Sequence, residues 1–420
     1  MIERKCRRGG RRSSPAWASL ARWTACGLAL VAAGSSGTRT ATAQEDSAAA
    51  RAGALSKAQA LIETGSFEEA VSLLRLAVGR NPADADARLM LGTALALLPR
   101  RSEALEELAA AIRLRPDFAP GHHAMGMALA RFVEPERARQ AFEKAIELDP
   151  RLAAAHVNLA LVLAQVGQTD AAARHLDTAV QIEGDSPAAA YAHRLRGLLY
   201  SEQDRPELAV SAFERAVALR PDDAEAFLHL GLARRRRLDF EGSLAALRQA
   251  VRLSPDSARA QYELGRELLR AGEAEPAAVH LGIAVRSEPD DKAALYALAR
   301  ALLMSGQPKE AEEVAARLRT VRSRAQQADQ HAFEASRLNN EGVELERAGS
   351  LRGAIERYAS ALEVDPLNTV FRRNLGLALC RAGRWGEGVA ELREVVRLDP
   401  SDQDAAKALY VALEKAATEP

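Results

Sequence analysis

Residues 224–257 read AEAFLHLGLARRRRLDFEGSLAALRQAVRLSPDS, and this 34-residue stretch decides the fold because the chain repeats it. Its thirty-second residue, proline, recurs on both sides of the stretch, mostly at a spacing of 34. The prolines of this series are Pro82, Pro116, Pro150, Pro187, Pro221, Pro255, Pro289, Pro366 and Pro400. A fixed period of roughly 20 to 50 residues indicates a repeat architecture, so we expect one array rather than separate globular domains.

Alignment on these prolines gives ten repeats, with insertions of 3 and 9 residues between some of them. The repeats are residues 51–84, 85–118, 119–152, 153–186, 190–223, 224–257, 258–291, 292–325, 335–368 and 369–402. Position 8 of every repeat is Gly or Ala, position 20 is equally small, and positions 7, 11 and 24 supply apolar bulk at helical spacing. Small residues let two antiparallel helices approach closely, so each repeat is predicted to be helix A, a turn and helix B.

The ends of the helices are also marked. Glycine at position 15, as in Gly167 and Gly272, suits the end of helix A, and proline at position 32 suits a helix start because its missing N–H costs nothing there. A two-helix repeat cannot bury its own apolar face, so neighbouring repeats are expected to stack into one continuous core.

The pattern of Leu-Gly at positions 7 and 8, Ala at 20 and Pro at 32, as in Leu230-Gly231 through Pro255, resembles the tetratricopeptide repeat family over residues 51–402. The resemblance implies an all-α fold, a right-handed superhelical solenoid of tandem helix-turn-helix repeats with a C-terminal capping helix. It also implies a protein or peptide partner. Position 4, often Trp in the family, holds His122, His156 and His193 in consecutive repeats.

The domain organisation follows from these boundaries. We expect a signal peptide at 1–43, a short linker at 44–50, repeats one to eight at 51–325, a helical extension or a polar linker at 326–334, repeats nine and ten at 335–402, and a capping helix and tail at 403–420. The cap carries apolar Leu409, Val411 and Leu413 with flanking charge, which suits the helix that ends a solenoid.

The amino terminus resembles a secretory signal. Residues 1–22 are basic, 23–33 are apolar, and Ala41-Thr42-Ala43 matches the small-x-small cleavage pattern. We therefore expect export to the periplasm, a mature chain that begins at Gln44, and no stable membrane span after cleavage. The alternative is an uncleaved membrane anchor, although eleven apolar residues are about half of what a spanning helix needs.

Charge and chemistry exclude several classes of function. Without residues 1–43 the chain has 49 basic and 56 acidic residues, a net charge of −7, which disfavours nucleic acid as a partner. Cys380 is then the single cysteine, so neither a disulfide nor a CxxC metal site is expected. No nucleophile with its base, carboxylate pair, phosphate-binding loop or metal-ligand spacing is apparent, so we predict no enzyme activity, cofactor or metal. A row of His122, His123, His156 and His193 is the best metal candidate, but stacked helices roughly 8 to 10 Å apart hold such side chains too far apart.

The predicted binding surface is the concave groove. In the family, positions 2, 5, 6, 9, 12 and 13 of helix A face the ligand, and these offsets form one stripe. In repeats five to eight the basic and aromatic members of this stripe are Arg194, Arg235, Arg236, Arg259, Arg266, Arg270, Arg300, Tyr191, Tyr262 and Tyr296. Against Glu202, Glu225 and Glu263 the seven arginines leave an excess of four positive charges, which would suit an acidic segment. The alternative is a merely solvated helix face.

Asparagine at position 6, in Asn158, Asn340 and Asn374, is a second candidate contact, because an amide can both donate to and accept from a peptide backbone. The three residues are similar to the asparagine ladder in the repeats of O-linked N-acetylglucosamine transferases, although seven repeats lack it. The carboxylate clamp of cochaperone repeats is incomplete here.

Together these features predict an exported, non-catalytic scaffold that binds an extended peptide or partner protein in the concave groove. The alternative is a recruiting or regulatory subunit of an envelope enzyme complex, in which the Tyr and Arg stripe would meet polysaccharide.

Overall fold

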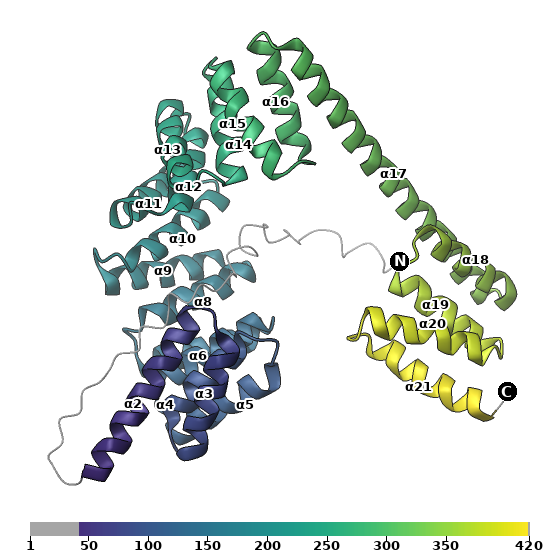
Figure 1. Ribbon diagram of the computed structural model, residues 1–420, viewed down its shortest axis with the longest axis horizontal. Helices are drawn as coiled ribbons and strands as arrows, with labels where there is room; N and C mark the ends of the chain where they lie inside the picture. The colour runs from purple at the N-terminus through teal and green to yellow at the C-terminus, as the bar shows by residue number, and fades with distance from the viewer. Residues whose placement is uncertain (1–41, 419–420) are drawn as a thin grey trace, which may run out of the picture. The chain divides into compact units, whose positions relative to one another are not determined.

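The computed structural model describes residues 42–418, and within that range the regular elements are α-helices, without a β-strand (Figure 1). The chain divides into two compact units, of which the first ends at Glu267 and the second begins at Leu268. Residues 1–41, which hold nearly all of the expected signal peptide, lie outside the described range. Residues 44–50, expected as a short linker, lie within helix α2 (Thr42–Glu63), whose many alanines favour the helical state.

The first compact unit holds six antiparallel helix pairs, α2/α3 to α12/α13, each formed by one repeat. Its remaining helices are α3 (Phe67–Arg80), α4 (Ala85–Ala96), α5 (Arg101–Leu114), α6 (Ala119–Arg131), α7 (Pro135–Leu148), α8 (Ala153–Gln165), α9 (Thr169–Glu183), α10 (Ala189–Glu202), α11 (Pro206–Leu219), α12 (Ala224–Arg236) and α13 (Phe240–Leu253). Helix α14 (Ala258–Arg270) contains the boundary between the two units.

The second compact unit continues the same alternation with one exception, the long helix α17. Its helices are α15 (Ala274–Ser287), α16 (Lys292–Met304), α17 (Pro308–Arg347), α18 (Leu351–Val364), α19 (Thr369–Arg381), α20 (Trp385–Leu398) and α21 (Gln403–Thr418). None of the helices between residues 42 and 418 is both long and apolar enough to cross a membrane.

Helix α17 combines helix B of repeat eight with helix A of repeat nine. It runs without interruption for 40 residues, and residues 326–334 lie inside it. Its first part packs on α16 and its last part on α18. All nine side chains of residues 326–334 are exposed, so this segment is held by its own backbone hydrogen bonds.

The turn after helix A takes a left-handed backbone at position 15, as the glycines there predict. Gly65, Gly167, Gly272, Gly306, Gly349 and Gly383 have φ between 76° and 84°. Three repeats adopt the same backbone without glycine, at Val133, Asp204 and Leu238, with φ of 62°, 55° and 64°. Nine of the ten repeats therefore share this turn geometry whether or not position 15 is glycine, and the exception is repeat two, which has Pro99 there.

The small residue at position 8 lies against position 24 of the same repeat. A Cβ atom added at Gly126 would lie 2.6 Å from the Phe142 ring, and one at Gly231 would lie 2.7 Å from Leu247. Phe142 and Leu247 are fully buried, so neither side chain has space to retreat. The A and B helices of each of these repeats are therefore as close as their side chains allow.

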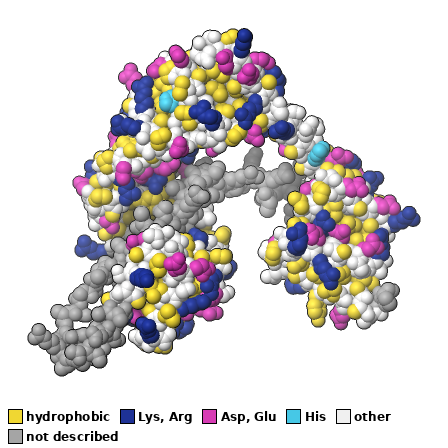
Figure 2. Space-filling view, viewed as in Figure 1, with side chains coloured by type: hydrophobic (Ala, Val, Ile, Leu, Met, Phe, Trp, Pro, Cys, Tyr) yellow, Lys and Arg dark blue, Asp and Glu magenta, His cyan; other side chains and the backbone are white. Residues whose placement is uncertain are grey.

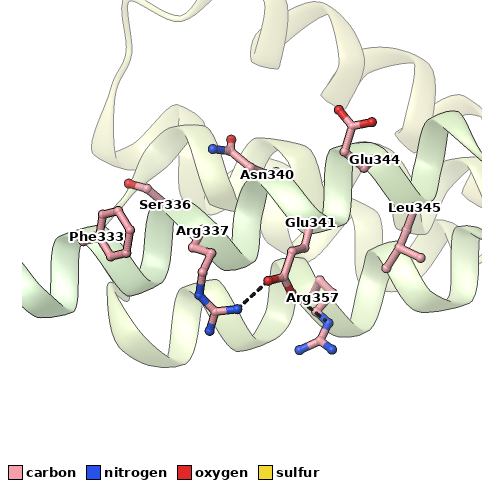
Figure 3. A pocket seen from close by; sticks show the side chains of 8 residues that line it. All are labelled: Phe333, Ser336, Arg337, Asn340, Glu341, Glu344, Leu345 and Arg357. Atoms are coloured by element: carbon pink, nitrogen blue, oxygen red, sulfur yellow. Dashed lines mark hydrogen bonds and ion pairs between the residues drawn. The ribbon is translucent and has the colours of Figure 1, made fainter.

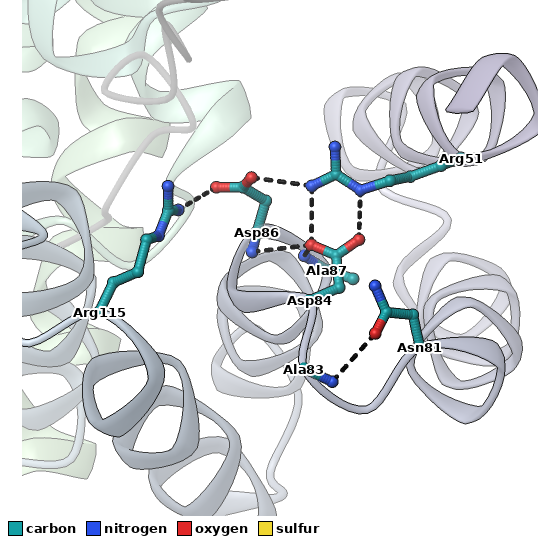
Figure 4. A network of polar contacts seen from close by, with 7 residues as sticks. All are labelled: Arg51, Asn81, Ala83, Asp84, Asp86, Ala87 and Arg115. Carbon is teal, nitrogen blue, oxygen red and sulfur yellow. Dashed lines mark hydrogen bonds and ion pairs between the residues drawn. The ribbon is translucent and has the colours of Figure 1, made fainter. Parts of the chain in front are cut away.

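Polar contacts tie the first repeat to the second (Figure 4). Asp84 caps α4 by accepting from the backbone N–H groups of Asp86 and Ala87, each at 3.1 Å. Arg51, at the start of the first repeat, donates to Asp84 Oδ1 at 2.7 Å, and this bond holds the pKa of the Asp84 carboxyl below its usual value. Arg115 pairs with Asp86 from the other side. The N-terminus of α4 thus contacts a side chain from within α2 and one from the end of α5.

Candidate functional site

Several of the predicted groove arginines tie successive repeats together. The Nε atom of Arg194 lies 3.3 Å from Oδ2 of Asp223, and the Arg194 side chain is only 15% exposed. Arg235 on α12 donates to Glu263 at 2.5 Å and to Glu267 at 3.3 Å, both on α14. Burial by itself lowers the pKa of Arg235, but the bonds and charges of the two glutamates outweigh burial and raise it. The guanidinium groups of Arg194 and Arg235 are therefore already paired with carboxylates of the chain itself.

The same kinds of tie recur elsewhere in the array. Arg373, which occupies position 5 of repeat ten as Arg194 does of repeat five, pairs with the α21 capping residue Asp402 at 2.7 Å. Arg236 donates to the backbone carbonyl of Ser201 in the preceding repeat at 2.5 Å. A contact that recurs at equivalent positions indicates a role in stacking repeats, so we assign Arg194, Arg235 and Arg236 to the scaffold.

The remaining members of the stripe are more accessible. Arg259, Arg266, Arg270 and Arg300 are exposed, and Tyr296 is 59% exposed. Tyr262 and Arg266 are stacked, with the guanidinium carbon 5.4 Å from the ring centre, and Tyr191 and Arg194 are stacked in the same way at 5.2 Å. On α16 the exposed residues Tyr296, Arg300 and Leu303 follow one another at offsets of four and three, which places them on one helix face.

The stripe is less basic than its sequence suggests. Asp223 and Glu267, which the stripe positions do not include, supply two more carboxylates to the same arginines, so the excess of four positive charges falls to two. In the view of Figure 2, basic and acidic side chains are interspersed over each compact unit. An excess of two positive charges is too small for the stripe to select an acidic partner by charge alone.

Two of the three asparagines also join repeats. Asn158 Nδ2 lies 2.8 Å from Nε2 of His123 in the preceding repeat, and Asn374 Nδ2 donates to Asn339 Oδ1 at 2.9 Å. In both cases position 6 of one repeat contacts position 5 of the repeat before it. Asn340 differs, because its amide is exposed and has no hydrogen-bond partner among residues 42–418.

Asn340 lines a hollow of about 730 Å³ between α17 and α18 (Figure 3). Its walls are formed by Phe333, Ser336, Arg337, Asn340, Glu341, Glu344 and Leu345 of α17 and by Arg357 of α18. Glu341 pairs with Arg337 on its own helix and with Arg357 across the hollow, where the charged atoms are 3.4 Å apart. Phe333, at one end, is 73% exposed.

The hollow exists because repeat nine begins a new stack. Position 3 is a buried alanine in six repeats, as at Ala87 and Ala226, but it is Arg337 in repeat nine. Position 7, usually leucine, is Glu341 there. Repeat nine thus has the charged residues Arg337 and Glu341 where other repeats have apolar residues that pack against the preceding repeat. The two charges form an ion pair with each other. The sequence therefore leaves this face of the α17/α18 pair uncovered.

The arrangement suits a segment of polypeptide. The free amide of Asn340 offers donors and an acceptor to a main chain, while Phe333 and Leu345 offer apolar contact on either side of it. The charged residues of the hollow, Arg337, Glu341 and Arg357, already pair with one another, so the ligand need not be charged. Position 6 predicted Asn340 from the sequence, but Phe333 lies in the nine-residue insertion, where no repeat position identified it.

The histidines at position 4 have a structural role. The rings of His122 and His156 lie 3.0 and 3.1 Å from the carbonyl oxygens of Pro116 and Pro150, six residues earlier. The same carbonyl of other repeats is bonded by Gln261, Arg88 or Arg372. This recurring bond, which joins helix A to the loop before it, was missed in the sequence. The signal was a polar residue six positions after the repeat proline.

Within residues 42–418 no group of three or more His, Cys, Asp or Glu side chains has the geometry to hold a metal ion. His156 instead pairs with His175, with their Nδ1 atoms 3.0 Å apart. Cys380 is buried, and burial raises the pKa of its thiol, which disfavours a reactive thiolate.

Comparison with known proteins identifies the family. Models of the tetratricopeptide repeat match residues 55–118, 119–152, 151–222, 194–258, 228–278, 262–328 and 339–403. The chain therefore belongs to the tetratricopeptide repeat family, as its repeat pattern predicted. Proteins of this family bind protein or peptide partners, and their fold is typically a non-catalytic scaffold for protein–protein interaction.

Individual relatives are similar to parts of this chain. YrrB, a TPR protein with an unusual peptide-binding site, is 24% identical with a TM-score of 0.40, over 46% of this chain and 98% of that one. PilF of Pseudomonas aeruginosa is 20% identical with a TM-score of 0.48, over 53% and 99%. The inactive TPR repeat-containing thioredoxin TTL3 of Arabidopsis thaliana is 39% identical over 64 residues, 15% of this chain and 9% of that protein. This chain thus spans less than a tenth of that relative.

Proposed function

We propose that this chain is an exported, non-catalytic scaffold that holds an extended segment of a partner protein, with the hollow between α17 and α18 as a principal contact. The observation that carries the proposal is the free Asn340 amide in a hollow of about 730 Å³, between the apolar side chains of Phe333 and Leu345. An amide recognises a main chain without regard to its side chains, and the apolar walls favour a bulky residue beside it.

The concave stripe is the second surface in the proposal. Arg259 and Arg266 on the first unit, and Arg300 with Tyr296 on the second, remain accessible. Each would contact an acidic stretch of the partner through exposed, salt-screened charges, which contribute modestly. Binding should therefore depend more on the hollow than on these arginines.

Site-specific photo-crosslinking tests the proposal. A benzophenone amino acid in place of Ser336, which lines the hollow, should capture a partner protein in cells of the source organism, and the additional substitution Asn340→Ala should reduce its yield. The same amino acid in place of Arg352, whose side chain is 94% exposed on α18 outside the hollow, is the control. Equal protein adducts at both positions would contradict the assignment of the hollow.

The crosslinked material also distinguishes the two functions considered. A protein adduct at Ser336 supports the scaffold, whereas glycan without protein would favour a recruiting subunit that contacts envelope polysaccharide. A third result, no adduct of either kind at position 336 in the presence of the full cellular envelope, would reject the hollow as a binding site.

Export is the other part of the proposal, and it rests on the signal-like residues 1–43. Amino-terminal sequencing of the protein from its own cells should give Gln44 as the first residue, in a periplasmic fraction. An intact Met1 in the cytosolic fraction would contradict export, and an intact Met1 in the membrane fraction would favour the uncleaved anchor.

A further inference from the structure

The last helix, α21, presents an uncovered apolar face. It packs against α20 with Ala405 and Ala412, which are fully buried, and Figure 1 shows it as the outermost helix of the second unit. On its remaining surface Tyr410 is 72% exposed, Val411 53% and Leu413 39%. Three large apolar side chains of this capping helix thus meet solvent.

This face is not one half of an incomplete repeat. If α21 were helix A of an eleventh repeat, Tyr410 would occupy position 8, which is Gly or Ala in all ten repeats because helix B packs there. A tyrosine would keep a regular helix B at a distance. A helix that packs on this face of α21 must therefore do so in a geometry different from that of helix B in a repeat.

The apolar residues on this face have the spacing of a two-stranded coiled coil. Ala406, Tyr410, Leu413 and Ala417 follow at offsets of four, three and four, and all four are exposed. This is the alternation of d and a positions in a heptad, in which each seam residue meets a second helix. Val411 is exposed but falls at a b position, outside the seam.

The charges beside the seam select the partner and its direction. Lys407 and Glu414 both occupy e positions, seven residues apart, and neither side chain has an ion-pair partner among the described residues. The g positions of the same heptads are Leu409 and Ala416, which pack against their own chain. Two parallel copies of the helix would therefore bring no opposite charges together. In an antiparallel pair, a twofold axis near residue 410 places Lys407 of each copy opposite Glu414 of the other.

We propose that this protein associates with a second copy of itself through α21, as an antiparallel helix pair with the seam Ala406, Tyr410, Leu413 and Ala417 and two Lys407–Glu414 ion pairs between the copies. The seam covers only four positions, so the interface is smaller than the roughly 1,200 Å² of stable complexes, and the dimer depends on concentration. Such pairing joins two scaffolds and presents their binding surfaces together, which raises avidity for a partner with repeated sites.

Sedimentation equilibrium of the full chain over a wide range of concentrations tests the pairing. The wild-type chain should pass from monomer to dimer, and Leu413→Glu should remain monomeric. Val411→Glu is the matched control, because it adds the same charge to an exposed position of the same helix outside the seam, and it should dimerise like the wild type. Equal effects of the two substitutions would overturn the seam, and so would a wild-type chain that is monomeric at every concentration.

Charge reversal tests the direction. Lys407→Glu places like charges opposite each other, and Glu414→Lys does the same with the other sign, so each alone should weaken association roughly tenfold. The double variant should associate like the wild type, and an equimolar mixture of the two single variants should form a mixed dimer. Lys309→Glu, an exposed change on α17, should have no effect. Failure of the double variant to recover would overturn the antiparallel pairing.

Discussion

Position 15 of the repeat shows how a single residue can conflict with the backbone that its neighbours impose. Val133 has a φ of 62° although its side chain is 75% exposed and makes no compensating burial. A left-handed backbone costs an L-residue about 1 to 2 kcal/mol, and more than that average is expected for a β-branched side chain. The strain persists because the A and B helices on either side of the turn are fixed by packing.

Val133→Gly should therefore stabilise the first compact unit by about 1 kcal/mol, the relief of strain less the extra freedom of glycine in the unfolded chain. Denaturant unfolding followed by circular dichroism measures the change as a higher midpoint. The reverse substitution, Gly167→Val at a φ of 80°, should lower the midpoint by a similar amount. A lower midpoint for Val133→Gly would show that the valine side chain contributes more than the strain costs.

Buried histidines should make the first compact unit sensitive to acid. His123 is 6% exposed, and burial lowers its pKa to about 4. A group with a lowered folded-state pKa contributes its full stability above the unfolded-state value of about 6.5 and loses that contribution as the pH falls toward 4. His123 should thus account for about 2 kcal/mol of lost stability between pH 7 and pH 5.

In His123→Gln the unfolding free energy should fall less steeply over that interval than in the wild type. Part of the dependence should remain, because burial also lowers the pKa of His229, to about 3. Urea titrations at a series of pH values give both slopes. Parallel slopes for the two proteins would mean that His123 is solvated in solution.

Within a repeat, the size of the residue at position 8 of helix A is matched to the size of the residue at position 24 of helix B. Repeats with glycine at position 8 can hold an aromatic ring at position 24, as Gly126 does with Phe142, whereas Ala160 of repeat four lies opposite Leu176. Gly126→Ala should destabilise the first unit by about 1 to 3 kcal/mol, because the added Cβ atom would lie 2.6 Å from the buried ring. Thermal unfolding measures the loss.

The same pairing predicts a rescue. Gly126→Ala combined with Phe142→Leu recreates the Ala and Leu pair found in repeat four. The double variant should therefore lose less unfolding free energy than the sum of the losses of the two single variants. A double-mutant cycle gives the coupling energy. Simple additivity would mean that the two positions are not matched to each other.

Between helices, two neighbouring arginines should behave in opposite ways. Arg235→Ala leaves Glu267, whose side chain is 4% exposed, without its cation. Breaking a fully buried ion pair typically lowers the unfolding free energy by about 3 to 5 kcal/mol. Because Arg235 itself is partly exposed, we expect a loss of about 2 kcal/mol. Arg266→Ala changes an exposed side chain and should cost less than about 0.5 kcal/mol. Denaturation midpoints separate the two. Similar midpoints would remove the distinction between scaffold and surface arginines.

This contrast also explains what could be predicted from the sequence. The fold was predictable because its signals are local to one repeat: a small residue at position 8 recurs in all ten repeats, proline at position 32 in eight and glycine at position 15 in six. The ion pairs of Arg194 and Arg235 were not predictable, because Asp223 is the last residue of repeat five and Glu267 lies in repeat seven, both outside the stripe positions, and only the folded array brings them to the arginines. Asn340 differs from the other two asparagines because repeat nine has no regular predecessor for its amide to contact.

At the scale of the whole molecule, stability in a solenoid passes from each repeat to the next through contacts between neighbours. The exposed segment 326–334 of α17 has no such contacts, since the buried side chains of this helix end at Val321 and resume at Ala335. The helix backbone is continuous there, but it couples the unfolding of the repeats on its two sides only weakly. We therefore expect repeats nine and ten, with their own apolar clusters, to unfold in a step separate from the repeats before them.

Asp329→Pro tests this separation. Proline inside a helix removes a backbone hydrogen bond and costs about 3 kcal/mol. The nearest buried side chains of α17, Val321 and Ala335, lie eight and six residues from Asp329, so no core contact is within one turn of the break. Both unfolding steps should keep their midpoints, while trypsin should cut faster at Arg322 and Arg324, which are exposed in the same helix. Asp329→Ala, which preserves the helix, should leave the cleavage rate unchanged. A lower midpoint for either step in the proline variant would show that residues 326–334 are packed against the rest of the chain, and the two groups of repeats would then form one cooperative array.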